Sequence, residues 1–318
     1  MPKGFFSQGV TLLTDATVSL AEVTSALEMH GYCVDDESAG ASAESWCFGG
    51  PSVLVPYRPE VNGSVLVDVV DHRWPDAMGD PKSDPTIFGA WSMGHFGPFA
   101  FPGSFERARQ HAWTWPDGRT IAPTHRGFIR VRSTYLAGAD DNALVLPEDY
   151  DPLPELLFIN GLVVALAGVS GVMCYFNPNG EVLRDLSSFR SICDACDVQQ
   201  QIPLLLWTNA RLFKLDDEFG LMDTVGNLQL DVDDVEAIYP NEEYDPNTIE
   251  NYLRNVTHYL LDLDREISTG ETFDGPGESD LAWVAEVCQE GALTPPRKVL
   301  RLCPQVSQEG IRRALAAV

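Results

Sequence analysis

Basic residues are scarce in this sequence. Its 318 residues include 21 Lys and Arg against 47 Asp and Glu, which gives a net charge of −26 at pH 7. Proteins that bind nucleic acid or anionic membrane surfaces neutralise phosphate groups with Lys and Arg. The composition therefore argues against both kinds of partner, and a protein partner is expected to be basic or neutral.

Segments for export and for membrane insertion are also lacking. The first twenty residues contain no apolar run followed by a small-residue cleavage site, so we expect no secretory signal. The apolar run from Leu156 to Val169 is shorter than the roughly 20 residues that cross a bilayer, and Asn160 and Gly161 interrupt it. We expect it to be a buried helix. The seven cysteines, an odd number, are then expected to be reduced thiols in a cytoplasm.

Motifs of known enzymes are missing as well. The chain contains no GxSxG, HExxH, P-loop or dinucleotide-binding fingerprint. The sequence therefore indicates no catalytic residue, no metal site and no cofactor, and it favours a protein that is not an enzyme. Residues 216–245 hold eleven acidic residues and no Lys or Arg but do not match a calcium-binding loop, so we interpret them as a solvated acidic face.

The patterns that are present predict an α+β fold in two lobes, each a mixed β-sheet packed by helices. The first lobe is expected over residues 1–200 and a smaller one over 201–318. Helices are expected at 19–31, with a capping box of Ser19 and Glu22, and at 246–263, with Asp245 as N-cap. Strands are expected at 10–14, 52–57, 64–72, 127–136, 171–176, 204–215, 281–288 and 297–303.

Residues 73–124 are rich in Pro, Gly and aromatic residues and lack a regular period. We interpret them as an ordered excursion from the first lobe with one short helix capped by Ser104. The helix at 151–168, between the strands at 127–136 and 171–176, predicts a parallel crossover. Gly161 would let this helix lie close to the sheet.

Cys193 and Cys196 have the CxxC spacing typical of redox and metal sites. They share a helical stripe with Leu186, Phe189 and Ile192, and they lie past the middle of that helix rather than at its start, where the helix dipole activates thiols. The chain has no second CxxC to complete a zinc site. Burial in the core is therefore favoured over a redox or metal role.

The histidines leave a metal site open as an alternative. Two histidines and a carboxylate can bind one metal ion, although scattered histidines in a long loop often bind none. The residues concerned lie in or beside the excursion and are His72, His95, His111, His125, Asp68, Asp71 and Glu106.

Arginine is concentrated between residues 107 and 132, where six Arg occur with the single acidic residue Asp117. Phe128, Arg130 and Arg132 share one face of the predicted strand. Arginine binds carboxylate and phosphate through two parallel hydrogen bonds, so this region is a candidate pocket for a small anionic ligand. Its candidate residues are Arg107, Arg109, His111, Trp113, His125, Arg126, Arg130 and Arg132. Alternatively, these arginines pair internally with the acidic residues of 139–141 and 147–151.

Several segments resemble an uncharacterised bacterial family, domain of unknown function 4261. The segments are PGSFERARQHAWTW, HRGFIRVRSTY, YFNPNGEVL, LMDTVGNLQLDVDDVEAIYP, YDPNTIENYLRNVTHYLL and GETFDGPGE. The resemblance covers most of the chain and implies a soluble bacterial α+β protein. It implies no activity, cofactor or site residue.

Two functions remain after these exclusions. The leading hypothesis is a non-enzymatic cytoplasmic binding protein, comparable by analogy to bacterial immunity or effector-accessory proteins, with a basic protein as partner. The alternative is an enzyme that acts on a small anionic substrate through the arginine, histidine and aromatic pocket.

Overall fold

The computed structural model describes residues 4–40, 42, 45–139, 144–263, 265–277 and 281–316. The chain divides into two compact units, of which the first ends at Trp207 and the second begins at Thr208. The expected lobe boundary, between residues 200 and 201, lies slightly earlier. Each unit contains one β-sheet with helices, which confirms the α+β class. No helix in the described ranges is both long enough and apolar enough to span a bilayer.

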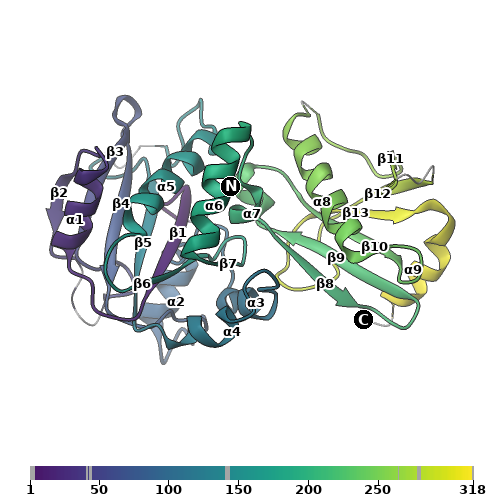
Figure 1. Ribbon diagram of the computed structural model, residues 1–318, viewed down its shortest axis with the longest axis horizontal. Coiled ribbons are helices and arrows are strands. Elements are labelled where there is room, and N and C mark those ends of the chain that lie inside the picture. Colours follow the sequence, from purple (N-terminus) through teal and green to yellow (C-terminus); the bar gives the residue numbers. More distant parts are fainter. Residues whose placement is uncertain are drawn as a thin grey trace. The chain divides into compact units, whose positions relative to one another are not determined.

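The first unit is built on a seven-stranded sheet with the order β2-β3-β4-β5-β1-β6-β7 (Figure 1). Its strands are β1 (Gln8–Thr14), β2 (Asp35–Ser38), β3 (Ser52–Arg58), β4 (Gly63–Val70), β5 (Gly127–Thr134), β6 (Val172–Asn177) and β7 (Val182–Asp185). Neighbouring strands are antiparallel throughout this sheet, where a mixed sheet was expected. The predicted crossover does make β5 and β6 run in the same direction, but β1 lies between them and is antiparallel to both.

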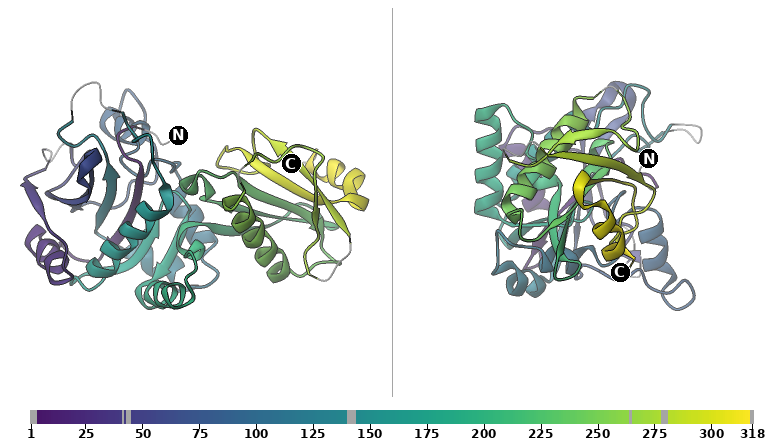
Figure 2. Two further views of the ribbon diagram at one scale, coloured as in Figure 1. Left: turned by 90° about the horizontal axis from the view of Figure 1, so that it is seen from above. Right: turned by 90° about the vertical axis from the view of Figure 1, so that its right-hand side faces the viewer.

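Helices α1 (Leu20–Met29), α5 (Pro152–Leu166) and α6 (Leu186–Gln199) pack on one face of this sheet (Figure 2, left). The capping box of α1 is confirmed, because Ser19 accepts from the Glu22 N–H and Glu22 accepts from the Ser19 N–H. Gly161 of α5 has a different role from the one expected. A side chain there would meet the Tyr32 hydroxyl at 2.5 Å, so this glycine makes room for Tyr32.

The excursion covers the opposite face of the sheet. It contains α2 (Pro85–Ser92), α3 (Ser104–Gln110), α4 (Gly118–Ile121) and the 3₁₀ helix η3 (Ala122–Thr124), rather than one short helix. Ser104 is the first residue of α3 and does not cap it. Asp76 caps it instead, because its carboxylate accepts hydrogen bonds from the Phe105 and Glu106 N–H groups at 2.8 and 2.9 Å.

Aromatic side chains form the core between the excursion and the sheet. Phe128 of β5 and Phe176 of β6 point toward the excursion and contact Trp74 edge to face. The other large members of this cluster are Trp91, Phe96 and Phe105. The excursion is therefore ordered because it buries its own aromatic residues against one face of strands β1, β4, β5, β6 and β7.

The second unit is built on a six-stranded sheet with the order β11-β12-β13-β10-β9-β8. Its strands are β8 (Asn209–Lys214), β9 (Phe219–Val225), β10 (Asp234–Pro240), β11 (Thr272–Asp274), β12 (Ala282–Cys288) and β13 (Val299–Pro304). This sheet is mixed, since β10 and β13 are parallel and the other pairs are antiparallel. The strand predicted over 204–215 is partly wrong, because Leu204–Trp207 forms the helical turn α7.

Two helices pack on opposite faces of the second sheet. Helix α8 (Pro246–Leu261) begins where predicted, with the Asp245 carboxylate accepting from the Asn247 N–H at 2.9 Å, and it buries Ile249, Leu253 and Val256. Helix α9 (Gln308–Leu315) packs Ile311 and Ala314 on the other face. Further short 3₁₀ helices in the described ranges are η2 (Pro59–Val61), η4 (Asn227–Leu230) and η5 (Gln305–Ser307).

Candidate functional site

Two of the predicted site arginines lie in the core of the first unit. Arg130 and Arg132 are 1% and 2% exposed, and their Nη2 atoms lie 2.6 and 2.8 Å from the two carboxylate oxygens of Asp68 on β4. Burial by itself raises the pKa of Asp68, but the two arginines outweigh burial and hold that pKa below its ordinary value. These arginines pair internally, as the alternative interpretation held, although their partner is not one of the acidic residues downstream. Of those, Asp140 and Asp141 lie outside the described residues.

The other candidate residues lie in different environments. Arg107 pairs with the buried Glu181 in the β6–β7 turn, with Nη2 2.6 Å from Oε1. Arg109 pairs with Glu106 and also donates to a backbone carbonyl of α4. Trp113 is 55% exposed, and the Cζ atom of Arg119 on α4 lies 4.9 Å from the centroid of its ring. Arg126 is exposed. The predicted residues thus range from the core to open surface.

The histidines of the excursion serve its packing. His125 is buried, accepts the Trp74 N–H at Nε2 (2.8 Å) and lies 2.7 Å from the Ala122 carbonyl at Nδ1. These two bonds require the neutral ring, and burial lowers the pKa of His125. His95 is also buried, and burial followed by the charge of Arg132 lowers its pKa to about 3. His111 is likewise largely buried. Nowhere in the described ranges do three or more His, Cys, Asp or Glu residues gather to hold a metal ion.

Because burial lowers the pKa values of His95 and His125, we expect the free energy of unfolding to decrease as the pH falls below 6.5, the ordinary histidine pKa. The folded protein binds fewer protons than the unfolded chain in this range, so stability that is complete above pH 6.5 is lost toward the folded pKa. Each such histidine contributes a slope of about 1.4 kcal/mol per pH unit. Urea unfolding between about pH 7.5 and 5.5 measures the slope, and His125→Gln, which keeps an acceptor for the Trp74 N–H, should remove one histidine's share. An unchanged slope in the His125→Gln variant would contradict the conclusion that His125 is neutral in the folded protein.

The two cysteines of the CxxC lie on α6, and neither is fully buried. Phe189 is the buried residue of this helix, where it stacks on Tyr175, while Cys193 and Cys196 are half-buried. The prediction that both thiols enter the core is therefore only partly met. Burial, and then the charge of Asp197, raises the pKa of Cys193 to about 12 and that of Cys196 in the same direction. The thiolate that redox chemistry and metal binding require is thus disfavoured.

A continuous line of charged side chains crosses the second sheet. Arg211, Asp223, Glu236, Arg301 and Glu286 stand opposite one another on the neighbouring strands β8, β9, β10, β13 and β12. We call these five residues the charged rung. Because side chains alternate between the faces of a strand, the rung lies on the face opposite α8. Arg211, Asp223 and Glu236 are almost wholly buried.

Asp223 is the centre of the buried part of the charged rung. It lies between Arg211 and Arg297, whose Nη2 atoms are 2.5 and 2.6 Å from its Oδ2. Arg297 also binds the buried Asp234 through Nε at 3.0 Å. Burial raises the pKa of Asp223, but the arginines outweigh it and hold the pKa below its ordinary value, whereas burial dominates at Asp234 and raises its pKa.

The interpretation of 216–245 as a solvated face is therefore wrong for three of its carboxylates. Asp223, Asp234 and Glu236 are buried and paired with arginines from strands or loops far away in the sequence. Other members, including Asp217 and Glu243, are exposed as predicted.

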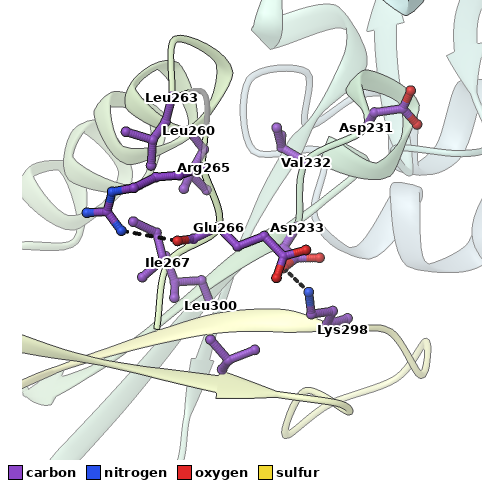
Figure 3. Close-up of a pocket in the computed structure, with 11 residues that line it drawn as sticks. Asp231, Val232, Asp233, Leu260, Leu263, Arg265, Glu266, Ile267, Lys298 and Leu300 are labelled. Carbon is purple, nitrogen blue, oxygen red and sulfur yellow. Dashed lines mark hydrogen bonds and ion pairs between the residues drawn. The ribbon is translucent and has the colours of Figure 1, made fainter. Parts of the chain in front are cut away.

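A pocket of about 450 Å³ opens beside the C-terminal end of α8 (Figure 3). We call it the α8 pocket. Its apolar lining is Val232, Leu260, Leu263, Ile267, Val287 and Leu300, and its charged lining is Asp231, Asp233, Arg265, Glu266 and Lys298. Lys298 Nζ lies 2.9 Å from Asp233 Oδ2, and this hydrogen bond raises the pKa of Lys298. Arg265 binds Glu271, outside the lining, through both carboxylate oxygens.

The α8 pocket has an acidic balance. Three carboxylates line it against two basic groups, and both basic groups already bind a carboxylate of this protein. An apolar wall with an acidic rim fits a side chain that has a long apolar stem and a cationic end, as Lys and Arg do. The geometry therefore suits a basic rather than an anionic ligand.

Residues 223–303 match the family model described as domain of unknown function (DUF4261), which confirms the resemblance for this part of the chain. No significant match was found among curated proteins or among solved structures. The matched segment contains the whole lining of the α8 pocket and all of the charged rung except Arg211.

Sequence reasoning missed both features of the second unit. A signal for the charged rung is nevertheless present, since each of the five strands carries a charged residue in its interior, as in FGLMDTV and VLRLCP. The α8 pocket left no comparable signal, because its lining comes from four separate segments of the chain.

Proposed function

We propose that this chain is a non-enzymatic cytoplasmic binding protein that holds a basic, partly apolar segment of another protein in the α8 pocket. The observation that carries the proposal is that every residue lining this pocket lies within the segment 223–303 that matches the family model. If proteins that match this model share a function through the matched segment, the pocket belongs to the part of the chain that they share.

Charge also supports the proposal. The chain has a net charge of −26, and the pocket rim adds a local excess of carboxylates. Long-range attraction would bring a basic partner toward this surface, and the half-buried Leu260, Leu263 and Ile267 would then contact the apolar stems of its side chains.

The competing function, an enzyme that uses Arg130 and Arg132 on a small anionic substrate, has less support. Both guanidinium groups are buried, and Asp68 already occupies the positions that a substrate carboxylate or phosphate would take. A substrate would have to displace a carboxylate from the core, which costs far more than binding at a surface.

The test compares two double variants that change the net charge equally. Asp231→Asn with Glu266→Gln removes two carboxylates from the α8 pocket, while Glu242→Gln with Glu243→Gln removes two exposed carboxylates from the β10–α8 connection. Asp231 has a left-handed backbone with φ of 58°, which asparagine tolerates. In pull-downs from host lysate at two salt concentrations, we expect the pocket variant to recover a basic partner at least about fivefold less than wild type.

The matched variant should recover that partner nearly as well as wild type. Equal loss in both variants would mean that bulk charge, and not the pocket, governs binding. Undiminished recovery by the pocket variant, or no partner at all, would contradict the proposal. Far-ultraviolet circular dichroism of both variants excludes unfolding as the cause.

A further inference from the structure

A second cavity lies on the other face of the same sheet, away from the α8 pocket. It has a volume of about 300 Å³ and is enclosed by β12, β13, α9 and the turn at residues 269–270. Val284, Ile311, Leu315 and Cys303 form apolar walls, and Arg301 and Arg312 supply the basic groups. We propose that this cavity, the α9 pocket, binds a small molecule with one carboxylate and an uncharged apolar body.

Arg301 is oriented by the buried part of the charged rung. Its Nε donates to Glu236 Oε1 at 2.6 Å, and Glu236 is itself fixed by the Ala292 N–H at 2.9 Å from its Oε2. Glu236 is fully buried and the Arg301 side chain is 12% exposed. The guanidinium is therefore held in one orientation before any ligand arrives, which reduces the entropy lost on binding.

Among the residues that the structure describes, the outer end of this guanidinium has only a weak partner. Arg301 Nη1 lies 3.5 Å from Glu286 Oε2, which is long for a charged hydrogen bond, and the Glu286 side chain is 58% exposed. An incoming carboxylate can therefore take the place of Glu286 on Arg301, while Glu286 turns into solvent. Arg312, exposed on α9 and lining the same cavity, provides the second positive charge.

The size and lining of the cavity limit the ligand. A cavity of about 300 Å³ is at the small end of ligand sites, so it fits a small ligand such as a medium-chain fatty acid. Because the walls are mainly apolar, the body of the ligand is expected to carry no further charge. This inference does not depend on the α8 pocket or on a protein partner.

Helix α9 offers a matched pair of arginines for the test. Arg312 lines the α9 pocket, whereas the adjacent Arg313 lines a separate hollow beside Asp216 and Asp217, and both arginines are exposed. Arg312→Gln and Arg313→Gln therefore remove the same charge from the same helix, but only one change lies in the proposed site. Arg301 is left unchanged, because its loss would leave Glu236 buried without this partner.

The experiment measures calorimetric binding of octanoate, with 1-octanol as the neutral probe of similar length. We expect octanoate to bind wild type at least about tenfold more tightly than 1-octanol, and Arg312→Gln to weaken octanoate about tenfold. Glu286→Gln should tighten octanoate binding, because it removes the carboxylate that competes for Arg301. Arg313→Gln should leave binding unchanged.

A general loss of structure cannot produce this pattern, since one variant weakens binding and another strengthens it. Equal affinity for octanoate and 1-octanol would overturn the carboxylate site. Equal effects of Arg312→Gln and Arg313→Gln, or no binding of octanoate at millimolar concentration, would overturn it as well.

Discussion

Alanine in place of Asp223 is expected to lower the free energy of unfolding by about 3–5 kcal/mol. The change would leave Arg211 and Arg297, which are 1% and 2% exposed at their side chains, in a dry environment without the carboxylate that both share. Removing one partner of a buried ion pair costs more free energy than the intact pair contributes to stability. The loss is measured by the shift of the urea midpoint at constant slope.

Asp217→Ala provides the control within the same acidic segment. Its side chain is 96% exposed and forms a surface ion pair with Lys214, so the midpoint should not move measurably. If the two variants unfolded at the same urea concentration, the distinction between buried and solvated acidic residues in 216–245 would be wrong.

Asp68→Ala is expected to destabilise the first unit to a similar extent, about 3–5 kcal/mol, because Arg130 and Arg132 would lose their shared partner. A sharper result is expected from replacing all three residues together. Asp68→Leu with Arg130→Met and Arg132→Met removes every charge from the cluster and substitutes apolar side chains of similar length. This triple variant should recover most of the stability that Asp68→Ala loses, since buried ion clusters often contribute little net stability over apolar packing.

Arg126→Ala is the control for the second prediction, because Arg126 comes from the same run of arginines but is exposed. It should unfold like wild type. A triple variant that is no more stable than Asp68→Ala would show that the polar bonds of this cluster, including the one from the Gly50 N–H to Asp68, are needed for the fold itself.

Features with short-range causes could be predicted from the sequence. Ser19 and Glu22 cap α1, and Asp245 with Pro246 begins α8, because capping depends on residues a few positions apart. The alternation along β5 also placed Arg130 and Arg132 correctly on one face. In these cases the local pattern and the tertiary packing favour the same structure.

Features with distant causes could not be predicted. The cap of α3 comes from Asp76, 29 residues before Phe105, so the prediction that Ser104 caps this helix is wrong. The partner of Arg130 lies 62 residues earlier, at Asp68, and a sequence does not indicate which carboxylate an arginine will meet. The burial of carboxylates in the acidic segment could not be predicted for the same reason. It depends on Arg211, Arg297 and Arg301, which lie on other strands or loops.

The charged rung also fixes the register of the second sheet. Strand β10 is buried on both faces. Its Val235 and Ala237 side chains face α8, and its Glu236 and Ile238 side chains face the other side of the sheet. A slip of one residue along any of these strands would turn its charged side chain toward α8, into the hydrophobic core that contains Trp283. Misaligned pairings are thereby penalised far more heavily than they would be in a sheet with two apolar faces.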